Sequence, residues 1–532
     1  MAEESHEKPA HQGDVEAGNE ASPAVETSAY YPSAEAPLSK IRFWLVLLSL
    51  ETGIFAVALD FSIVPTAVPW ISSNGNLGYN NSAWIGNAFF LSFALGLLLW
   101  PKLCRGLSYK FAFFVALGVF NYASGRAAVS KSAEHQVAWR LAAGAGAGGI
   151  YGLFDVIMRV IVPLEEVEKY MSVSRMIWAA TAVAGPLIAG ALTEHVDPRM
   201  CLSFGEFIGL VSYSMTLFFL NLPDPSWSWW STICRFDYLG TLCLVAGTAC
   251  MVLATASGST ILPWVSGQLV TTSIAFSGLV LLTAFFIVET LVPEPLLHPS
   301  LFRNPGLLTT ALAAFFHGAN MAGTMYYIPH FFQLVFQNYP LISGVGMLPM
   351  TLGIGIGGTA STFITARYRT SLRSARVGAV LLVLASGLMV RWNTDTSRAE
   401  TVAVLALLGL GQGAAMIGLL HTAQASVDSP ALATATMNFM FVQASGFTFG
   451  VACFGALYFN KLRSLLAGLG LGATNVDAIL ADALYIDDNE LDVDVKHPAV
   501  LALSSCIRQR DAQKDEDSST LEDRITSYEA ES

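Results

Sequence analysis

Charged side chains are scarce in this sequence. They make up 13% of its 532 residues, whereas hydrophobic residues make up 53%. A soluble domain typically carries about 25% charged residues, so this composition excludes one and indicates a chain that crosses a membrane several times. The formal net charge is −12, but much of the acid lies in the two tails. The sequence has no basic patch of the kind that binds nucleic acid.

Cysteine pairs and catalytic motifs are missing too. The seven cysteines include no Cys-x-x-Cys pair, so we predict neither a metal site nor a disulfide framework. We find no clustered His/Asp motif, nucleophile elbow or nucleotide-binding loop, and we expect no catalytic residue, no cofactor and no enzyme activity. Without an ATP site, any pumping must draw on an ion gradient. Residues 1–40 also lack the short basic and apolar regions of a cleavable signal peptide.

Long apolar segments are what the sequence has instead. Windows of about 19 residues predict membrane-spanning helices. The candidates are 43–70, 83–101, 111–129, 137–160, 171–192, 201–221, 237–256, 268–288, 307–333, 342–366, 376–392, 401–422 and 434–459. We predict no fourteenth span, because residues 465–486 hold two aspartates and residues 498–507 are too short to cross a bilayer. The expected fold class is an all-α polytopic membrane protein.

The spans divide into two regions of similar construction, which suggests repeated halves joined by an inserted hairpin. Most Lys and Arg residues of the short loops lie on one side if the N-terminus is cytosolic, and we predict that orientation. The predicted domains are a disordered cytosolic tail (1–40), an N-terminal half of six helices (41–222), a linker with two extra helices (223–300), a C-terminal half of five clear helices (301–460) and an acidic, mostly disordered tail (461–532).

The fourth span carries both charge and a stripe of glycines. Gly144, Gly148 and Gly152 share one helix face, and Arg140 lies one turn before them on that face. Such a stripe lets a helix pack closely against a neighbour. A charge inside a membrane helix usually faces the bundle interior and often marks a pathway. Arg140 could tune a nearby carboxylate or hold an anionic group, or it could be a structural clamp on backbone carbonyls.

The first span carries the best candidate for proton coupling. Asp60 lies deep in an apolar run, with Pro65 and Pro69 loosening the helix behind it. A buried carboxylate can take up and release a proton, and the less favoured alternative is a fixed partner for an arginine or for a backbone amide. Glu51 lies nine residues earlier, on the opposite helix face, and is a weaker candidate.

Other spans offer packing sites and polar groups. Gly185, Pro186 and Gly190 in the fifth span combine a proline with small residues, which permits a bend against a close neighbour. Isolated polar side chains in later spans could line a cavity, although each could instead make an ordinary interhelical hydrogen bond. The candidates of this kind are Glu206, His317, Gln412 and Gln443.

Together these motifs resemble the major facilitator superfamily, and specifically the fourteen-span drug:proton antiporters common among fungal multidrug and toxin efflux pumps. Leu59 to Pro69 is similar to the group's first-helix signature. Arg140 followed by Gly144 to Ile150 is similar to its fourth-helix signature, and Gly185 to Gly190 resembles its fifth-helix antiporter signature. The resemblance covers residues 41–460 and implies a fold of two helical halves plus an inserted two-helix linker.

The loop between the second and third spans departs from this pattern. The group normally has an aspartate where this sequence has Arg105, and an arginine where it has Tyr109. In the group this loop is thought to latch the inward-facing and outward-facing states through charge pairs. The departure therefore raises the question of whether the loop at 101–110 still controls gating. The group's fourteenth helix is also missing.

The resemblance implies a monomeric, proton-coupled exporter of small hydrophobic molecules such as toxins, drugs or secondary metabolites. Asp60 would carry the proton, Arg140 would tune it, and the glycine-rich faces would permit gating. The partners would be the small-molecule substrate, protons and the lipid bilayer, with the plasma membrane favoured over a vacuolar or vesicle membrane. Two alternatives are an uptake carrier for a polar solute such as an iron chelate and a non-transporting relative.

Overall fold

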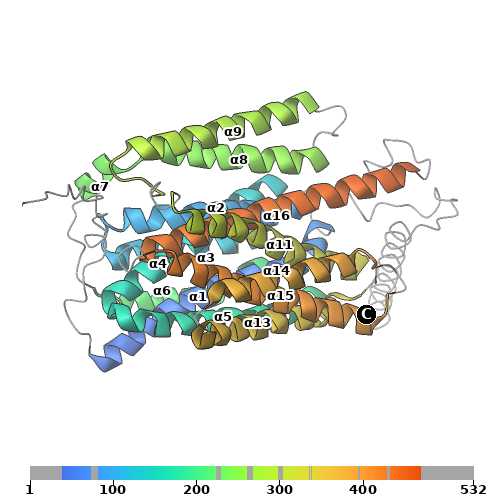
Figure 1. Cartoon of the computed structure of the whole chain (residues 1–532), viewed down its shortest axis with the longest axis horizontal. Helices are drawn as coiled ribbons and strands as arrows, with labels where there is room; N and C mark the ends of the chain where they lie inside the picture. The colour runs from blue at the N-terminus through green and yellow to red at the C-terminus, as the bar shows by residue number, and fades with distance from the viewer. Residues whose placement is uncertain are drawn as a thin grey trace, which may run out of the picture.

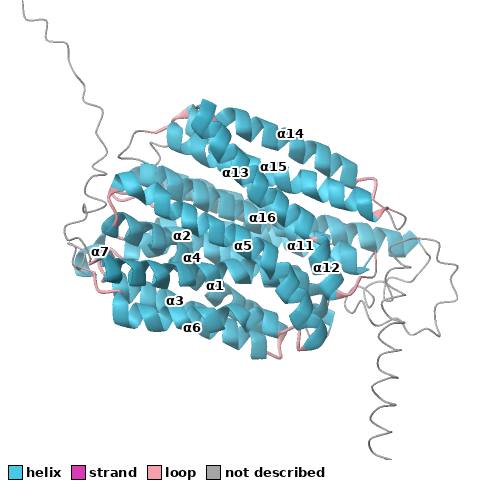
Figure 2. Ribbon diagram, turned by 90° about the horizontal axis from the view of Figure 1, so that it is seen from below, coloured by secondary structure: helices cyan, strands magenta, loops and turns pink. Residues whose placement is uncertain are grey.

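A computed structural model of the chain describes residues 39–468, apart from 74–81, 223–228, 261–267, 298–302, 335, 337, 369, 393–395 and 428–431. These described segments form a bundle of near-parallel helices (Figure 1; Figure 2). Most of the predicted tails, 1–40 and 461–532, lies outside the described residues, except that α1 begins at Lys40 and α16 continues to Gly468. The segment at 498–507 and most of the segment at 465–486, both weighed for a fourteenth span, also lie outside them.

The first six long helices form the N-terminal half, and three further helices form the linker. They are α1 (Lys40–Ser73), α2 (Ser82–Leu103), α3 (Tyr109–Val129), α4 (Ala133–Ile161), α5 (Leu164–His195) and α6 (Met200–Phe219), followed by α7 (Trp229–Arg235), α8 (Tyr238–Thr260) and α9 (Gln268–Leu291). The C-terminal half comprises α11 (Pro305–Leu334), α12 (Pro340–Gly346), α13 (Leu348–Tyr368), α14 (Ser371–Met389), α15 (Arg398–Ala425) and α16 (Leu432–Gly468).

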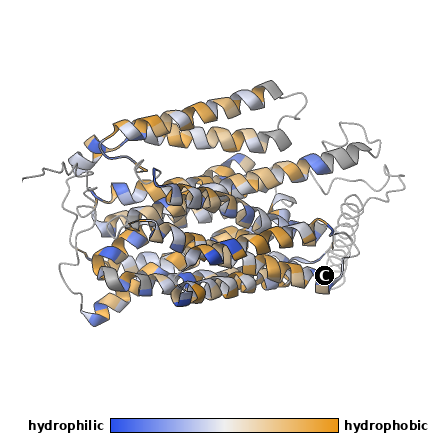
Figure 3. Ribbon diagram, in the orientation of Figure 1, coloured by the Kyte–Doolittle hydropathy of each residue, from blue (hydrophilic) through white to orange (hydrophobic). Residues whose placement is uncertain are grey.

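Among the described residues, twelve helices are long and apolar enough to cross a membrane, which makes this a multi-pass membrane protein. Figure 3 shows apolar residues along the lengths of these helices. The ninth predicted span, at 307–333, is the 30-residue helix α11. It is not among the twelve because polar residues such as His317 and Asn320 lower its hydropathy. The predicted span at 342–366 is divided between α12 and α13.

Each half packs around its own central helices. In the N-terminal half, α4 packs against α2 and α3, and α1 packs against α5 and α6. In the C-terminal half, α15 packs against α13 and α14, and α11 packs against α16. Glycines permit close approach of the backbones at these contacts. A Cβ atom on Gly148 would collide with the Phe93 carbonyl of α2, and one on Gly413 would collide with the Ile354 carbonyl of α13.

The halves meet along two seams, where α2 packs against α16 and α5 packs against α12 and α13. The hairpin of α8 and α9 lies along one side of the bundle, where α8 contacts α16 and α2 (Figure 1). The predicted linker is therefore a pair of helices laid over the first seam. Successive long helices run in opposite directions along the bundle. We call the end at which α1 begins the predicted cytosolic end, and the end at which α1 finishes the predicted outer end.

Candidate functional site: a buried ion pair at the meeting of the halves

Asp60 of α1 and Arg140 of α4 form a buried ion pair. The guanidinium donates two hydrogen bonds, from Nη1 to Asp60 Oδ2 at 2.9 Å and from Nη2 to Asp60 Oδ1 at 2.7 Å. Each side chain is only 2% exposed. A paired, two-point contact of this kind fixes both the distance and the orientation of the two groups. The structure thus brings together the two residues that the sequence predicts as coupling candidates.

Arg140 has further partners that hold it in place. Its Nε donates to the Ile85 carbonyl of α2 at 3.3 Å. Its guanidinium carbon lies 4.2 Å from the centre of the Phe89 ring, where the negative face of the ring attracts a cation. Arg140 therefore binds a backbone carbonyl as well as the Asp60 carboxylate. These contacts tie α1, α2 and α4 together at one point.

The glycine stripe explains how α4 comes close enough to α2 for this contact. A Cβ atom on Gly144 would collide with the Phe89 carbonyl, and one on Gly152 would touch Pro101 at 3.1 Å. Side chains at these positions would push α4 away from α2. The stripe therefore faces α2, on the side of α4 that also carries Arg140.

The glycine and proline segment of α5 lies between the two halves. A Cβ atom on Gly185 would collide with Ser62, two residues after Asp60 on α1. The Pro186 carbonyl lies against Gly344 of α12, and Gly190 packs against Leu341 of the same helix. The segment therefore contacts both the helix that carries the carboxylate and the opposite half.

Three of the predicted cavity residues meet in one polar cluster of the C-terminal half. His317 Nε2 lies 3.0 Å from the Gln412 carbonyl, and Gln443 Nε2 lies 3.1 Å from His317 Nδ1. All three residues are 5% exposed or less. An amide NH₂ can only donate, so Nδ1 accepts and Nε2 carries the proton that the Gln412 carbonyl receives. This is the neutral tautomer of the histidine.

Glu206 lies apart from that cluster. It is on α6, and a Cβ atom on Gly125 of α3 would collide with its carboxylate. Both helices belong to the N-terminal half, where they pack against each other. Hydropathy alone could not separate Glu206 from the other three residues, because it gives no information about which neighbours a helix face meets.

Aromatic residues crowd the space next to the ion pair. Phe61 follows Asp60, and its ring centre lies 5.4 Å from that of Phe89, 5.1 Å from that of Trp178 and 6.1 Å from that of Phe447. Phe447 belongs to α16, so this cluster joins the two halves. The four rings come from α1, α2, α5 and α16, so no single stretch of the sequence marks this cluster.

Polar contacts join the halves at the predicted outer end. Tyr326 Oη donates to the Ser82 carbonyl at 2.7 Å, and Gln333 Nε2 donates to the Thr66 carbonyl at 3.0 Å. The Leu341 amide donates to Glu194 at 3.3 Å. Sequence reasoning missed these contacts. Most of the acceptors are backbone carbonyls, which every residue possesses and no motif marks.

Two helical halves that meet around buried polar groups define a class, the polytopic membrane transporters. The sequence profile of the Major Facilitator Superfamily matches residues 50–451. Because this match covers most of the chain, the protein belongs to the major facilitator superfamily. Members of this superfamily are transporters, so the chain is a transporter and not an enzyme.

The most similar curated relatives include fungal efflux proteins. The chain is 29% identical over 414 residues to the MFS efflux transporter aclA of Aspergillus oryzae, which covers 77% of this chain and 74% of that protein. It is 27% identical over 452 residues to the efflux pump aflT of Aspergillus parasiticus, with 84% and 87% covered.

Solved transporters share the fold. A bacterial homologue of the human lysosomal transporter Spinster, inward-facing and unoccupied, matches with a TM-score of 0.58 and 16% identity, covering 89% of this chain and 94% of that chain. A D-xylose–proton symporter matches with a TM-score of 0.54 and 12% identity, covering 83% and 95%. At these identities the likeness shows the fold alone.

Proposed function

We propose that this transporter exports small hydrophobic molecules in exchange for protons. The observation that carries the proposal is the two-point ion pair between Asp60 and Arg140, buried beside aromatic rings that reach from one half to the other. The names of the fungal relatives support export as the direction. Monomeric action and the plasma membrane are parts of the same proposal.

The ion pair supplies a way for a proton to change the shape of the bundle. Protonation of Asp60 removes the negative charge that faces Arg140, and a buried cation without a counter-charge is costly. The guanidinium then keeps the Ile85 carbonyl and the Phe89 ring as partners. Since Asp60 is on α1 and Arg140 on α4, loss of the pair frees these helices to move against each other.

The aromatic cluster supplies a surface for an apolar substrate. Phe61 is the next residue after Asp60, so a molecule bound against its ring would lie beside the group that takes up the proton. Large apolar rings bind flat hydrophobic molecules without demanding a particular hydrogen-bond pattern. Proton and substrate would therefore act on the same short segment of α1.

The contacts at the predicted outer end support alternating access around this site. Tyr326, Gln333 and Leu341 close the bundle there, as an inward-facing state requires. Along α5, Gly190 is covered by α12, whereas Met176, on nearly the same helix face, is 71% exposed. Export would require the outer contacts to break while the opposite ends of the halves come together.

Transport into sealed inside-out vesicles tests this function. An acidic lumen should drive uptake of apolar fluorescent compounds, and a protonophore should abolish that uptake. Asp60→Asn should abolish the gradient-driven uptake. Asp155→Asn is the matched control, because Asp155 is also buried and bonded at two points by Arg159, at 2.9 and 3.0 Å, within one helix.

The outcomes separate the competing functions. Gradient-driven uptake that survives Asp60→Asn would place the coupling proton elsewhere. Accumulation of a polar solute in right-side-out vesicles, with no export, would indicate the uptake carrier. No flux of any compound by a folded, inserted protein would indicate the non-transporting relative.

A further inference from the structure

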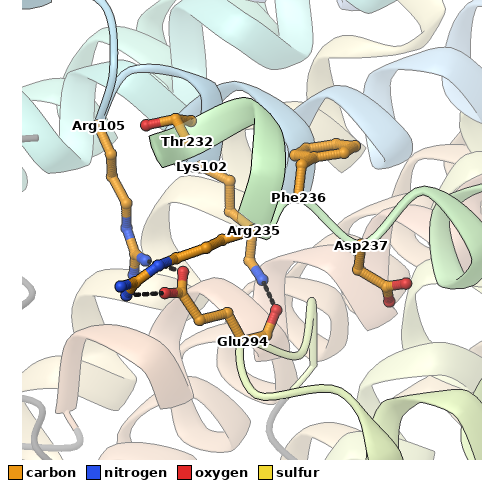
Figure 4. Close-up of a pocket in the computed structure, with 7 residues that line it drawn as sticks. All are labelled: Lys102, Arg105, Thr232, Arg235, Phe236, Asp237 and Glu294. Carbon is orange, nitrogen blue, oxygen red and sulfur yellow. Dashed lines mark hydrogen bonds and ion pairs between the residues drawn. The ribbon is translucent and has the colours of Figure 1, made fainter. Parts of the chain in front are cut away.

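The loop between α2 and α3 is bonded to the segment that follows α9. Arg105 Nη1 lies 2.9 Å from Glu294 Oε2, and Arg235 Nη1 lies 3.4 Å from Glu294 Oε1 (Figure 4). Lys102 Nζ donates to the Glu294 carbonyl at 2.8 Å and to the Pro295 carbonyl at 2.5 Å. One acidic residue of the linker is thus held by three cations from two other segments.

Tight packing surrounds these charges. A Cβ atom on Gly106 would lie 2.5 Å from Thr232 Oγ1 and 3.2 Å from Trp229 Cα, so only glycine lets α7 approach the loop this closely. Leu296 and Leu297 are 5% and 3% exposed and belong to a hydrophobic cluster formed mostly by residues of the N-terminal half. The linker segment is therefore built into that half at its predicted cytosolic end.

The ion pair with Glu294 explains why the loop carries a positive charge at position 105 instead of a negative one. Arg105 occupies a position where the resemblance leads one to expect an aspartate. Here the acidic partner comes from Glu294, 189 residues later in the chain. Arg105 and Glu294 are 18% and 24% exposed, so water screens their attraction less than that of a fully exposed pair.

We propose that Glu294 is a positioning residue for transport, which clamps the α8–α9 hairpin to the gating loop of the N-terminal half through Arg105. The inference rests on the proposed transport function. The hairpin then moves with the N-terminal half as one body, and α8 slides against α16 when the halves exchange positions. Substituting an aspartate for Arg105 would bring it closer to the superfamily pattern but would place like charges together in this chain.

Charge reversal and repair test the clamp. Arg105→Glu and Glu294→Arg should each lower the maximal transport rate about five- to tenfold, the effect expected of a modest coupling free energy between distant sites. The apparent KM should stay unchanged because neither residue touches the aromatic site. The double variant should recover most of the rate. Arg367→Asp, at an exposed arginine of α13 that stacks on its neighbour Tyr368, is the matched control and should leave the rate unchanged.

A native thiol gives a readout that does not depend on transport. Cys104 precedes Arg105 and is 1% exposed, whereas Cys234 on α7 is exposed. Maleimide should label Cys104 slowly in the wild type, measured by peptide mass spectrometry with Cys234 as the reference. Either single charge reversal should speed the labelling of Cys104, and the double variant should slow it again.

The two readouts distinguish failure of the clamp from failure of the proposed function. The labelling of Cys104 could speed up in the single variants and slow again in the double variant while the protein transports nothing. That result would keep the clamp as a structural contact but overturn Glu294 as a positioning residue for transport. Singles that transport at the wild-type rate, or a double variant no better than its parents in both readouts, would overturn the clamp itself.

Discussion

Removing the carboxylate of Asp60 should destabilise the protein and uncouple it, and a second substitution should separate these two effects. Asp60→Leu leaves Arg140 buried at 2% exposure, and its remaining partners among the described residues are the Ile85 carbonyl and the Phe89 ring. Breaking a buried ion pair by removing one partner costs about 3–5 kcal/mol, because the remaining charge has no compensation. The two hydrogen bonds and the near-complete burial place this pair within that range.

Replacing both partners should reverse most of that loss. Asp60→Leu with Arg140→Met fills the same space with apolar groups, and such replacements of buried pairs are often neutral or stabilising. We expect the double variant to unfold near the wild-type temperature in detergent while remaining unable to use a proton gradient. The assay is thermal unfolding followed by tryptophan fluorescence, paired with gradient-driven uptake.

Two results would refute this reasoning. A single variant as stable as the wild type would mean that Arg140 has other strong partners. A double variant that still accumulates substrate against a proton gradient would show that the pair does not couple transport.

Three further predictions follow from the packing. Gly144→Leu should severely lower the yield of folded protein, because the added side chain would collide with the Phe89 backbone. Size-exclusion chromatography measures this yield, and the control is Gly387→Leu, where nothing lies within 4 Å of an added Cβ. Gly344→Val should separate α12 from the Pro186 carbonyl and favour a state in which the bundle is open at its predicted outer end. A cysteine placed at Leu341 should then react faster with maleimide. Burial raises the pKa of Cys104 to about 12, so the reactive thiolate is a minor species at neutral pH. Its labelling rate should therefore keep rising about tenfold per pH unit through pH 9, and a plateau below pH 9 would contradict that burial.

The helices could be predicted because the membrane imposes a simple rule. A span must be apolar over about 20 residues, and the predicted spans correspond to long helices even where Arg126 lies near the end of α3. Among the described long helices, α11 is the one left out of the twelve candidates, because it carries polar residues such as His317, which is bonded to Gln443. The break between α12 and α13 left no trace in the hydropathy.

The sequence predicts which residues belong to the candidate site, but it does not predict which of them contact each other. Asp60 and Arg140 were found because charges are rare in membrane helices, but they are 80 residues apart and no periodicity shows that they meet. The pair of Asp155 and Arg159 lies within a single helix, where one-turn spacing alone brings the two side chains together. Glu51 receives a hydrogen bond from Ser174 at 2.7 Å, another contact between helices that spacing alone could not predict.

Contacts made through backbone atoms or through distant charges were the least predictable. Tyr326 donates to a carbonyl of α2, and any residue could supply that acceptor. In the sequence, Arg105 raised the question of whether the loop still controls gating, because it stands where the group has an aspartate. Its partner Glu294 lies in the linker, so the reversed charge is compensated by a segment that the motif does not include.

The most direct test of proton-coupled export is the proton movement that substrate itself evokes. Inside-out vesicles with an acidic lumen and a pH-sensitive dye should show proton release when an apolar substrate is added, and Asp60→Asn should abolish this release while Asp155→Asn preserves it. Substrate entry without any proton release in the wild type, or release of equal size in Asp60→Asn, would contradict the role assigned to the buried ion pair.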